Sequence, residues 1–198
     1  KAAFNVLVGA VDEITNISHT ILRRFDLYKQ EQVSNLNLYE SKTKGTIAGE
    51  GASFFLLSSE PAPTDYAKLD AMATFYKPGG IKEIENEINS FLENIRLDIG
   101  GVDLIITGKN GDAASDKIYE QLQESIFHKK DTVNYKHLCG EYPTSTGFAL
   151  WLAANIIKTG EVPAVLGLPG NASGKPNRIL IYNHYLNIHH SLFLVSAC

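Results

Sequence analysis

The sequence predicts an α/β fold, in which helices cover the faces of a mixed β-sheet. Two observations support this prediction. Short apolar runs of strand length alternate with longer segments in which apolar residues recur at helical spacing, and glycine or proline separates one segment from the next. A final pair of apolar runs closes the chain as two adjacent strands. With 198 residues, the chain is long enough for one large domain or two small ones.

The spacing of apolar residues predicts where each element lies. Two near-continuous apolar runs, residues 5–10 and 52–57, have the pattern of strands buried on both faces. Between them, residues 20–25 are expected to form an amphipathic turn or helix, and residues 30–44 a polar surface segment. The other expected strands are residues 67–75, 102–107, 132–135, 178–182 and 192–196, and the other expected helices are residues 81–94, 115–127 and 143–158. The last helix is apolar on nearly all sides, which predicts a central buried position.

Two prolines mark the one predicted domain boundary. Pro61 and Pro63 interrupt both helices and strand ladders, so residues 1–60 are expected to end a first unit and residues 61–198 to form a second. The chain enters an apolar strand within four residues of its start. We therefore expect its first residue to be an internal residue of a longer polypeptide.

Composition and charge narrow the function classes. A formal net charge of −4 argues against a general nucleic-acid or membrane-surface binder, which needs a basic face. The longest apolar stretches fall well short of the ~20 residues that cross a bilayer. The two cysteines, Cys139 and Cys198, cannot form a disulfide framework, and no CxxC pair indicates a metal site. We expect a cytoplasmic protein without metal or cofactor.

Five short motifs carry more specific information. They are VGAVDE at residues 8–13, GTIAGEGA at 45–52, ITGKNGD at 106–112, KHLCGE at 136–141 and YLNIHH at 185–190. Their order and intervals resemble the AGGAE, DGFVxGEGA, HGTGTxxGD, KxxxGH and GFGGTN motifs of the β-ketoacyl-acyl carrier protein synthases. Each motif alone is weak, but the five together cover nearly the whole chain, which is similar to the second half of such an enzyme.

The resemblance implies a thiolase-like, layered αβαβα architecture, of which this chain supplies the second half, with the nucleophilic cysteine in the first half. It implies acyl transfer by decarboxylative Claisen condensation in fatty acid or polyketide-type biosynthesis. In that reaction two histidines donate hydrogen bonds to the developing enolate and thioester oxygens. It also implies acyl carrier protein as a partner, and a dimer formed with itself or with an active synthase.

The sequence departs from the family at the site. Lys136 and Asp112 keep the family's residue types. Counting back from Asp112 places the first family histidine at Leu104, which can neither donate nor accept a hydrogen bond. Counting forward from Lys136 places the second at Glu141, whose ionised carboxylate only accepts and would repel an enolate. We expect Lys136 and Glu141 to form an ion pair that locks the site.

Three functions therefore stay open. A modified synthase would take its histidines from elsewhere, with His189 and His190 at the closing turn as candidates. A non-catalytic partner, like a chain-length factor, would keep the fold and shape the pocket of an active synthase. The loss of both histidines favours this second function. The third is a non-enzymatic scaffold or binding module that inherited the fold.

Two further features have simpler interpretations. Cys139 is expected to be a buried, inert thiol rather than a nucleophile. Residues 167–174 are rich in glycine but lack the strand-then-helix context of a phosphate loop, so a surface loop is expected there.

Overall fold

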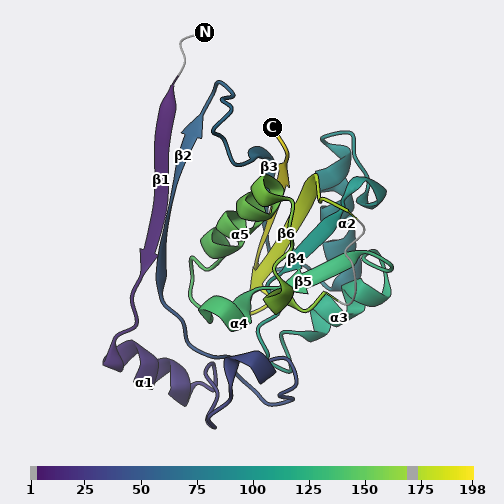
Figure 1. Cartoon of the computed structure of the whole chain (residues 1–198). Helices are drawn as coiled ribbons and strands as arrows, with labels where there is room; N and C mark the ends of the chain where they lie inside the picture. The colour runs from purple at the N-terminus through teal and green to yellow at the C-terminus, as the bar shows by residue number, and fades with distance from the viewer. Residues whose placement is uncertain (1–3, 169–173) are drawn as a thin grey trace.

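The computed structural model describes residues 4–168 and 174–198 and contains the expected α/β fold. A five-stranded mixed sheet forms its centre (Figure 1). In spatial order the strands are β3 (Lys68–Tyr76), β7 (His189–Ser196), β6 (Arg178–Tyr185), β4 (Leu104–Thr107) and β5 (Asp131–Asn134). Each of these elements overlaps a strand that the sequence predicts.

Helices cover both faces of this sheet. The helices are α2 (Ile81–Glu93) and α3 (Lys117–Glu124) on one face, with α4 (Lys136–Cys139) and α5 (Thr146–Thr159) on the other (Figure 1). Three short 3₁₀ helices lie in the connections, at Asn35–Asn37, Ile99–Gly101 and Ala164–Leu166. The chain thus contributes a three-layer helix–sheet–helix unit, as expected for part of a layered architecture.

Successive side chains of each strand point to opposite faces of the sheet, and this alternation produces two separate hydrophobic cores. In β4, Ile105 packs with α2 and α3, whereas Leu104 and Ile106 pack with α5. In β6, Leu180 and Ile181 divide in the same way. Successive side chains of a strand point to opposite faces, so a sheet covered on both faces needs continuous apolar strands. This explains the near-continuous apolar runs in the sequence.

The sheet register determines where functional loops meet. β4 is parallel to both β5 and β6, and Thr107 is paired with Asn134 on one side and Tyr182 on the other. The carboxyl ends of these three strands therefore lie at one edge of the sheet. Ligand and active sites of parallel sheets form at that edge. The segments that follow β4 and β5 both begin there.

The first sixty residues form a different arrangement. β1 (Asn5–Asp12) and β2 (Gly51–Ser58) pair as an antiparallel two-stranded ribbon, and α1 (Asn16–Arg24) follows β1. The ribbon lies beside α5 and apart from the five-stranded sheet (Figure 1). The division at residues 60 and 61 falls between the two sheets, although the domain boundary itself stays a prediction.

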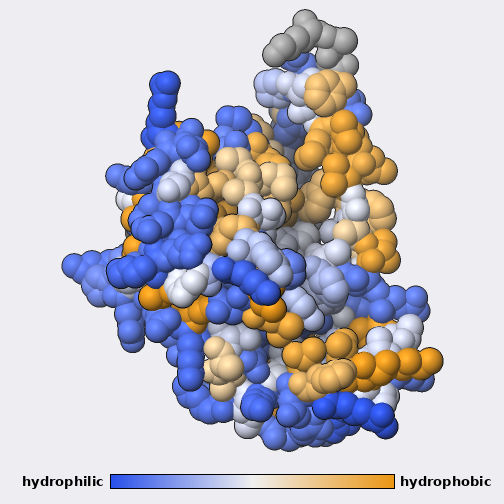
Figure 2. Space-filling model, turned by 180° about the vertical axis from the view of Figure 1, so that it is seen from behind, coloured by the Kyte–Doolittle hydropathy of each residue, from blue (hydrophilic) through white to orange (hydrophobic). Residues whose placement is uncertain are grey.

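These two strands are open to solvent on one face in the chain as described. Leu7 and Leu56, on the face of the ribbon that points away from α5, are 69% and 71% exposed. Phe54 and Val11 on the same face are each 63% exposed. Apolar side chains gather over this part of the surface (Figure 2). The strands have the sequence of buried strands, but this chain supplies a covering layer, α5, on one face only.

Helix α5 is also less buried than its composition predicts. Five positions are buried against the sheet, namely Ala149, Leu152, Ala153, Ile156 and Ile157. Trp151, on the opposite side, is 50% exposed. The prediction of a helix buried on all sides is therefore wrong within this chain. No helix in the described ranges is long and apolar enough to span a membrane.

The open ribbon face leads to a prediction about the 198-residue chain by itself. Leu56→Thr should reduce aggregation, measured by light scattering against concentration, with little loss of stability, because Leu56 is 71% exposed. As a control, Leu180→Ala should cost about 2–5 kcal/mol of unfolding free energy, because Leu180 is fully buried. A comparable loss from Leu56→Thr would contradict the exposed face.

Candidate functional site

A buried ion pair occupies the carboxyl edge of the sheet. The side chain of Lys136, at the start of α4, is fully buried, and its ammonium donates to Glu141 Oε1. It also donates to Ser145 Oγ at 2.9 Å. Glu141 Oε2 accepts from Asn110 Nδ2 at 2.7 Å. The ion pair expected from the sequence is therefore present, and both carboxylate oxygens already have a donor.

Two glycines bring the motif around Glu141 against the GTIAGEGA motif. Gly49 and Gly140 pack so closely that a Cβ on Gly49 would lie 2.1 Å from the Cys139 carbonyl oxygen. The Gly49 N–H donates to the Glu141 carbonyl at 3.0 Å, and the Glu141 N–H donates to the Ile47 carbonyl at 2.8 Å. Gly140 also has φ = 74°, a conformation that favours glycine. The glycines of two separate motifs thus position the Glu141 backbone.

Asn110 connects the ion pair to the loop after β4, and sequence reasoning missed it. Its backbone N–H and that of Gly111 each donate to Asp116, both at 2.9 Å. Its carbonyl accepts from Thr46 Oγ1 at 2.6 Å, and its side-chain oxygen accepts from the Asp112 N–H at 3.1 Å. The only sequence signal is an Asn–Gly pair, which indicates a turn but no role in a site.

Asp112, the second residue that keeps the family's residue type, fixes the loop after β4 through hydrogen bonds. Its carboxylate accepts backbone N–H groups of Gly45, Ala114 and Ser115. Burial by itself would raise the pKa of Asp112, but the hydrogen bonds from Ser115, Gly45 and Ala114 outweigh it, so the pKa lies below its ordinary value. Asp112 is therefore ionised at neutral pH, and it makes no hydrogen bond to Lys136 within the described residues.

The two candidate histidines lie away from the ion pair. His190 is 2% exposed and faces the α2–α3 side of the sheet, where its ring stacks on Phe75 at 4.6 Å. Its Nδ1 lies 2.9 Å from the Tyr182 hydroxyl, and burial lowers its pKa. His189 is exposed and lies 5.0 Å from the ring of Tyr76. Strand alternation directs His190 to the α2–α3 face, and no hydrogen bond joins either ring to Glu141 in the described residues.

Leu104, where counting places the first family histidine, lies away from the carboxyl edge of the sheet. It begins β4 and is buried. The strand ends three residues further along, at Thr107, about 10 Å away at ~3.3 Å per residue. At Gly108, the first residue after the strand, a Cβ would lie 1.8 Å from Asn183 Oδ1. Position 108 therefore has no space for a side chain.

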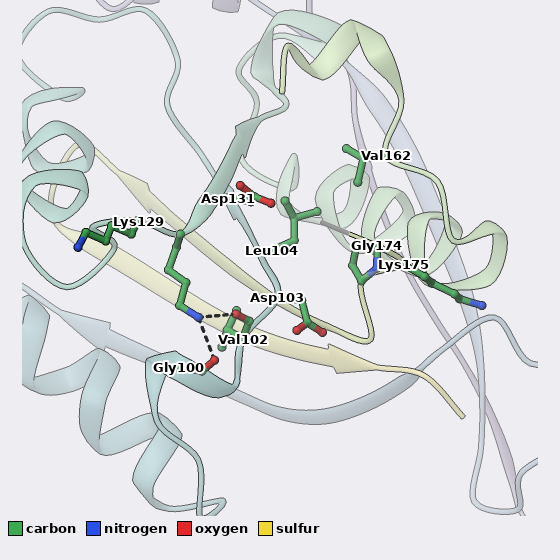
Figure 3. A pocket seen from close by; sticks show the side chains of 11 residues that line it. Gly100, Val102, Asp103, Leu104, Lys129, Asp131, Val162, Gly174 and Lys175 are labelled. Atoms are coloured by element: carbon green, nitrogen blue, oxygen red, sulfur yellow. Dashed lines mark hydrogen bonds between the residues drawn. The ribbon is translucent and has the colours of Figure 1, made fainter. Parts of the chain in front are cut away.

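Leu104 instead lines a cavity of about 220 Å³ at the opposite end of the strand (Figure 3). In that cavity the Lys130 ammonium donates to the carbonyl oxygens of Gly100 at 2.9 Å and Val102 at 2.8 Å. These two bonds tie the segment before β4 to the start of β5. We assign this lysine a structural role.

A second pocket, of about 290 Å³, is lined by Glu141 but not by Lys136. Its walls come from α1 and the following loop, the loop after β4, the segment after α4 and the β6–β7 turn; they are formed by Leu22, Leu27, Tyr28, Thr46, Asn110, Asp112, Ala114, Ser115, Glu141, Tyr142, Tyr185 and Leu186. The pocket and the ion pair together form the candidate site.

The remaining reactive groups near the site are inert. Partial burial raises the pKa of the Cys139 thiol to about 12, so the thiol stays protonated, as expected of an inert cysteine, although Cys139 is half-buried and not fully buried. Within residues 4–168 and 174–198, no group of three or more His, Cys, Asp or Glu side chains is placed to hold a metal ion. Residues 169–173, most of the expected glycine-rich surface loop, lie outside the described residues.

Asp116 provides a pH-dependent test of this loop. Burial raises its pKa to about 6, despite the N–H bonds from Asn110 and Gly111 that lower it. An acid with a raised folded-state pKa destabilises the fold as pH rises from about 4 to about 6. Relative to Asp116→Asn, the wild type should therefore lose ~3 kcal/mol of unfolding free energy over that pH range. Urea unfolding at several pH values measures this difference. Parallel pH profiles for the two proteins would contradict the assignment.

Comparison with solved structures shows which known proteins share the fold of this chain. No protein-family model and no curated protein matches the sequence. Among solved structures, the ishigamide ketosynthase/chain length factor has a TM-score of 0.78 at 14% identity, with 98% of this chain and 54% of that chain covered. A β-ketoacyl synthase from Burkholderia phymatum STM815 has a TM-score of 0.70 at 12% identity, with 98% and 55% covered.

A third structure contains a type II PKS acyl-carrier protein in complex with its ketosynthase. It has a TM-score of 0.75 at 13% identity, with 98% of this chain and 56% of that chain covered. The chain thus spans about half the length of these proteins. The expected thiolase-like architecture is confirmed at the level of the fold. This chain has the fold of about half of a ketosynthase or chain length factor.

Proposed function

We propose that this chain belongs to a β-ketoacyl synthase-like protein of fatty acid or polyketide-type biosynthesis that acts as a non-catalytic, chain-length-factor-like partner of an active synthase. The observation that carries the proposal is the closed ion pair of Lys136 and Glu141. One structural neighbour is itself described as a ketosynthase/chain length factor, which supports the same assignment.

The chemistry of condensation explains why a closed pair opposes catalysis. A decarboxylating malonyl unit develops negative charge on an oxygen, which must be stabilised by aimed hydrogen-bond donors. At Glu141 both oxygens accept hydrogen bonds, and the Lys136 ammonium donates to Glu141 and Ser145. Gly108, the first residue after β4, contributes no side chain. The ammonium donors of the site are therefore directed at Glu141 and Ser145 and not at a developing enolate.

The partners follow from the proposed role. A neighbouring structure holds an acyl-carrier protein against its ketosynthase, which supports acyl carrier protein as a partner of the assembly here. We further propose a dimer with an active synthase or with itself, a division into units at residues 60 and 61, and a cytoplasmic location. A scaffold that inherited the fold would differ by lacking any effect on a synthase partner.

The proposal predicts no condensation by the intact protein alone. Supplied with malonyl-carrier and an acyl-carrier primer, the wild type and Glu141→Gln should both give product at background level, measured by mass spectrometry of the carrier. Adding the partner synthase should yield product, and its chain length should depend on this protein. A robust wild-type rate that Glu141→Gln abolishes would show a catalytic carboxylate and remove the proposal.

The same pair predicts a stability effect. Glu141→Gln should cost roughly 3–5 kcal/mol in urea unfolding, because it leaves the buried Lys136 ammonium without a counter-charge. The control Glu120→Gln should change little, because its pair with Lys109 is partly exposed. Replacing both partners, as Lys136→Met with Glu141→Leu, should recover most of the loss. Equal losses of unfolding free energy from Glu141→Gln and Glu120→Gln would contradict a stabilising role of the buried ion pair.

A further inference from the structure

The turn between β6 and β7 forms one wall of the pocket that Glu141 lines. Tyr185 and Leu186 both line this pocket. Leu186 and Asn187 have φ angles of 53° and 54°, in the left-handed region that is unfavourable for residues other than glycine. The turn therefore needs contacts from its neighbours to keep this conformation.

A histidine supplies one of these contacts. The Asn187 N–H donates to His184 Nδ1 at 3.1 Å, and His184 Nε2 lies 3.2 Å from the Ser115 carbonyl oxygen. Because Nδ1 accepts a hydrogen bond, the ring is neutral and its proton lies on Nε2, which donates to Ser115. A second proton, on Nδ1, would place two N–H groups against each other. The bond from Asn187 therefore exists only while His184 is neutral.

The groups packed around His184 oppose a positive charge on its ring. His184 and His190 are both buried and lie directly opposite each other on β6 and β7, with ring centroids 5.4 Å apart. Tyr119 of α3 stacks on His184 at 4.7 Å, and the ring of Tyr182 lies 6.3 Å away. Burial raises the pKa of both phenols, so neither tyrosine supplies an anion.

These surroundings determine the pH range in which His184 holds the turn. Burial, above all, lowers the pKa of His184 to about 3, together with His190 and Lys136. The Ser115 carbonyl and the Asp112 carboxylate act in the opposite direction and do not outweigh burial. A histidine released from these neighbours titrates near pH ~6.5. Because the folded pKa is the lower one, the turn is most stable above pH ~6.5 and loses stability as the pH falls toward the folded value.

We propose that His184 makes the β6–β7 turn a pH-sensitive wall of this pocket, closed while the ring is neutral and released when the ring takes up a proton. The protonated ring gives up the hydrogen bond from Asn187, and Tyr185 and Leu186 move away with the turn. Acid thereby opens the pocket from one side. This device is independent of the proposed partner function, because it needs neither a synthase nor acyl carrier protein.

Hydrogen–deuterium exchange of the intact protein tests the device. A peptide that contains residues 185–188 is followed by mass spectrometry at pH 6.5 and 4.5, with correction for the intrinsic amide exchange rate at each pH. Its protection should fall roughly 50-fold between these pH values, as expected for one group whose pKa changes from about 6.5 in the open turn to about 3 in the closed turn. It should also stay below the protection of residues 104–107 in β4, because the opening is local. Unchanged protection of the turn, or equal protection of the two peptides, would overturn the proposal.

Two variants test the assignment to His184. His184→Gln keeps a side-chain oxygen that can accept from Asn187 but takes up no proton, so most of the pH-dependent loss should disappear. His189→Gln is the matched control, because His189 is an exposed histidine at the same turn; the roughly 50-fold loss should remain. Asp116 titrates in the same pH range, but it is present in both variants. Persistence of the loss in His184→Gln, or its disappearance in His189→Gln, would overturn the proposal.

Discussion

The buried Lys136 ammonium is the constraint on which the rest of the site depends. A charge with no exposed surface must be paired and hydrogen-bonded, because an uncompensated buried ion costs several kcal/mol. Glu141 supplies the counter-charge, and Ser145 accepts a further hydrogen bond. Glu141 in turn has one oxygen left, which Asn110 satisfies. One lysine thereby determines the arrangement of three other side chains, two from the α4–α5 connection and one from the loop after β4.

This requirement extends into the loops around the sheet edge. Asn110 can reach Glu141 only because Asp116 holds the backbone of the loop after β4 through two N–H bonds. Thr46 and Gly45 from the first sixty residues are bonded to the same loop, through Asn110 and Asp112. The two parts of the chain are thus joined at the site by polar contacts. Their apolar surfaces, in contrast, meet mainly where β2 lies against α5.

The closed pair and the adjacent pocket lie at one edge of the sheet and share Glu141. The Lys136 ammonium donates to Glu141 and Ser145. A fold found in ketosynthases and chain length factors can hold different sites, because the fold positions the strand ends and the side chains decide the chemistry.

The sequence by itself determined the elements, because their signals are local. Apolar period identified all seven strands of the described residues and the main helices. The order of five motifs indicated the fold. The family resemblance of the KHLCGE motif also placed Glu141 beside Lys136, and the ion pair confirms that placement.

Only the tertiary structure decided the rest, because each remaining feature depends on which residue faces which layer. Counting along the chain placed the first family histidine at Leu104, whereas the strand boundaries put Leu104 at the end of β4 far from the ion pair. Strand alternation directed His190 to the α2–α3 face of the sheet. Asn110 became part of the site through backbone bonds to Asp116, which lies six residues away and has no motif of its own. Burial of the β1–β2 ribbon likewise depends on a covering layer, and a strand's own sequence cannot specify whether that layer is present.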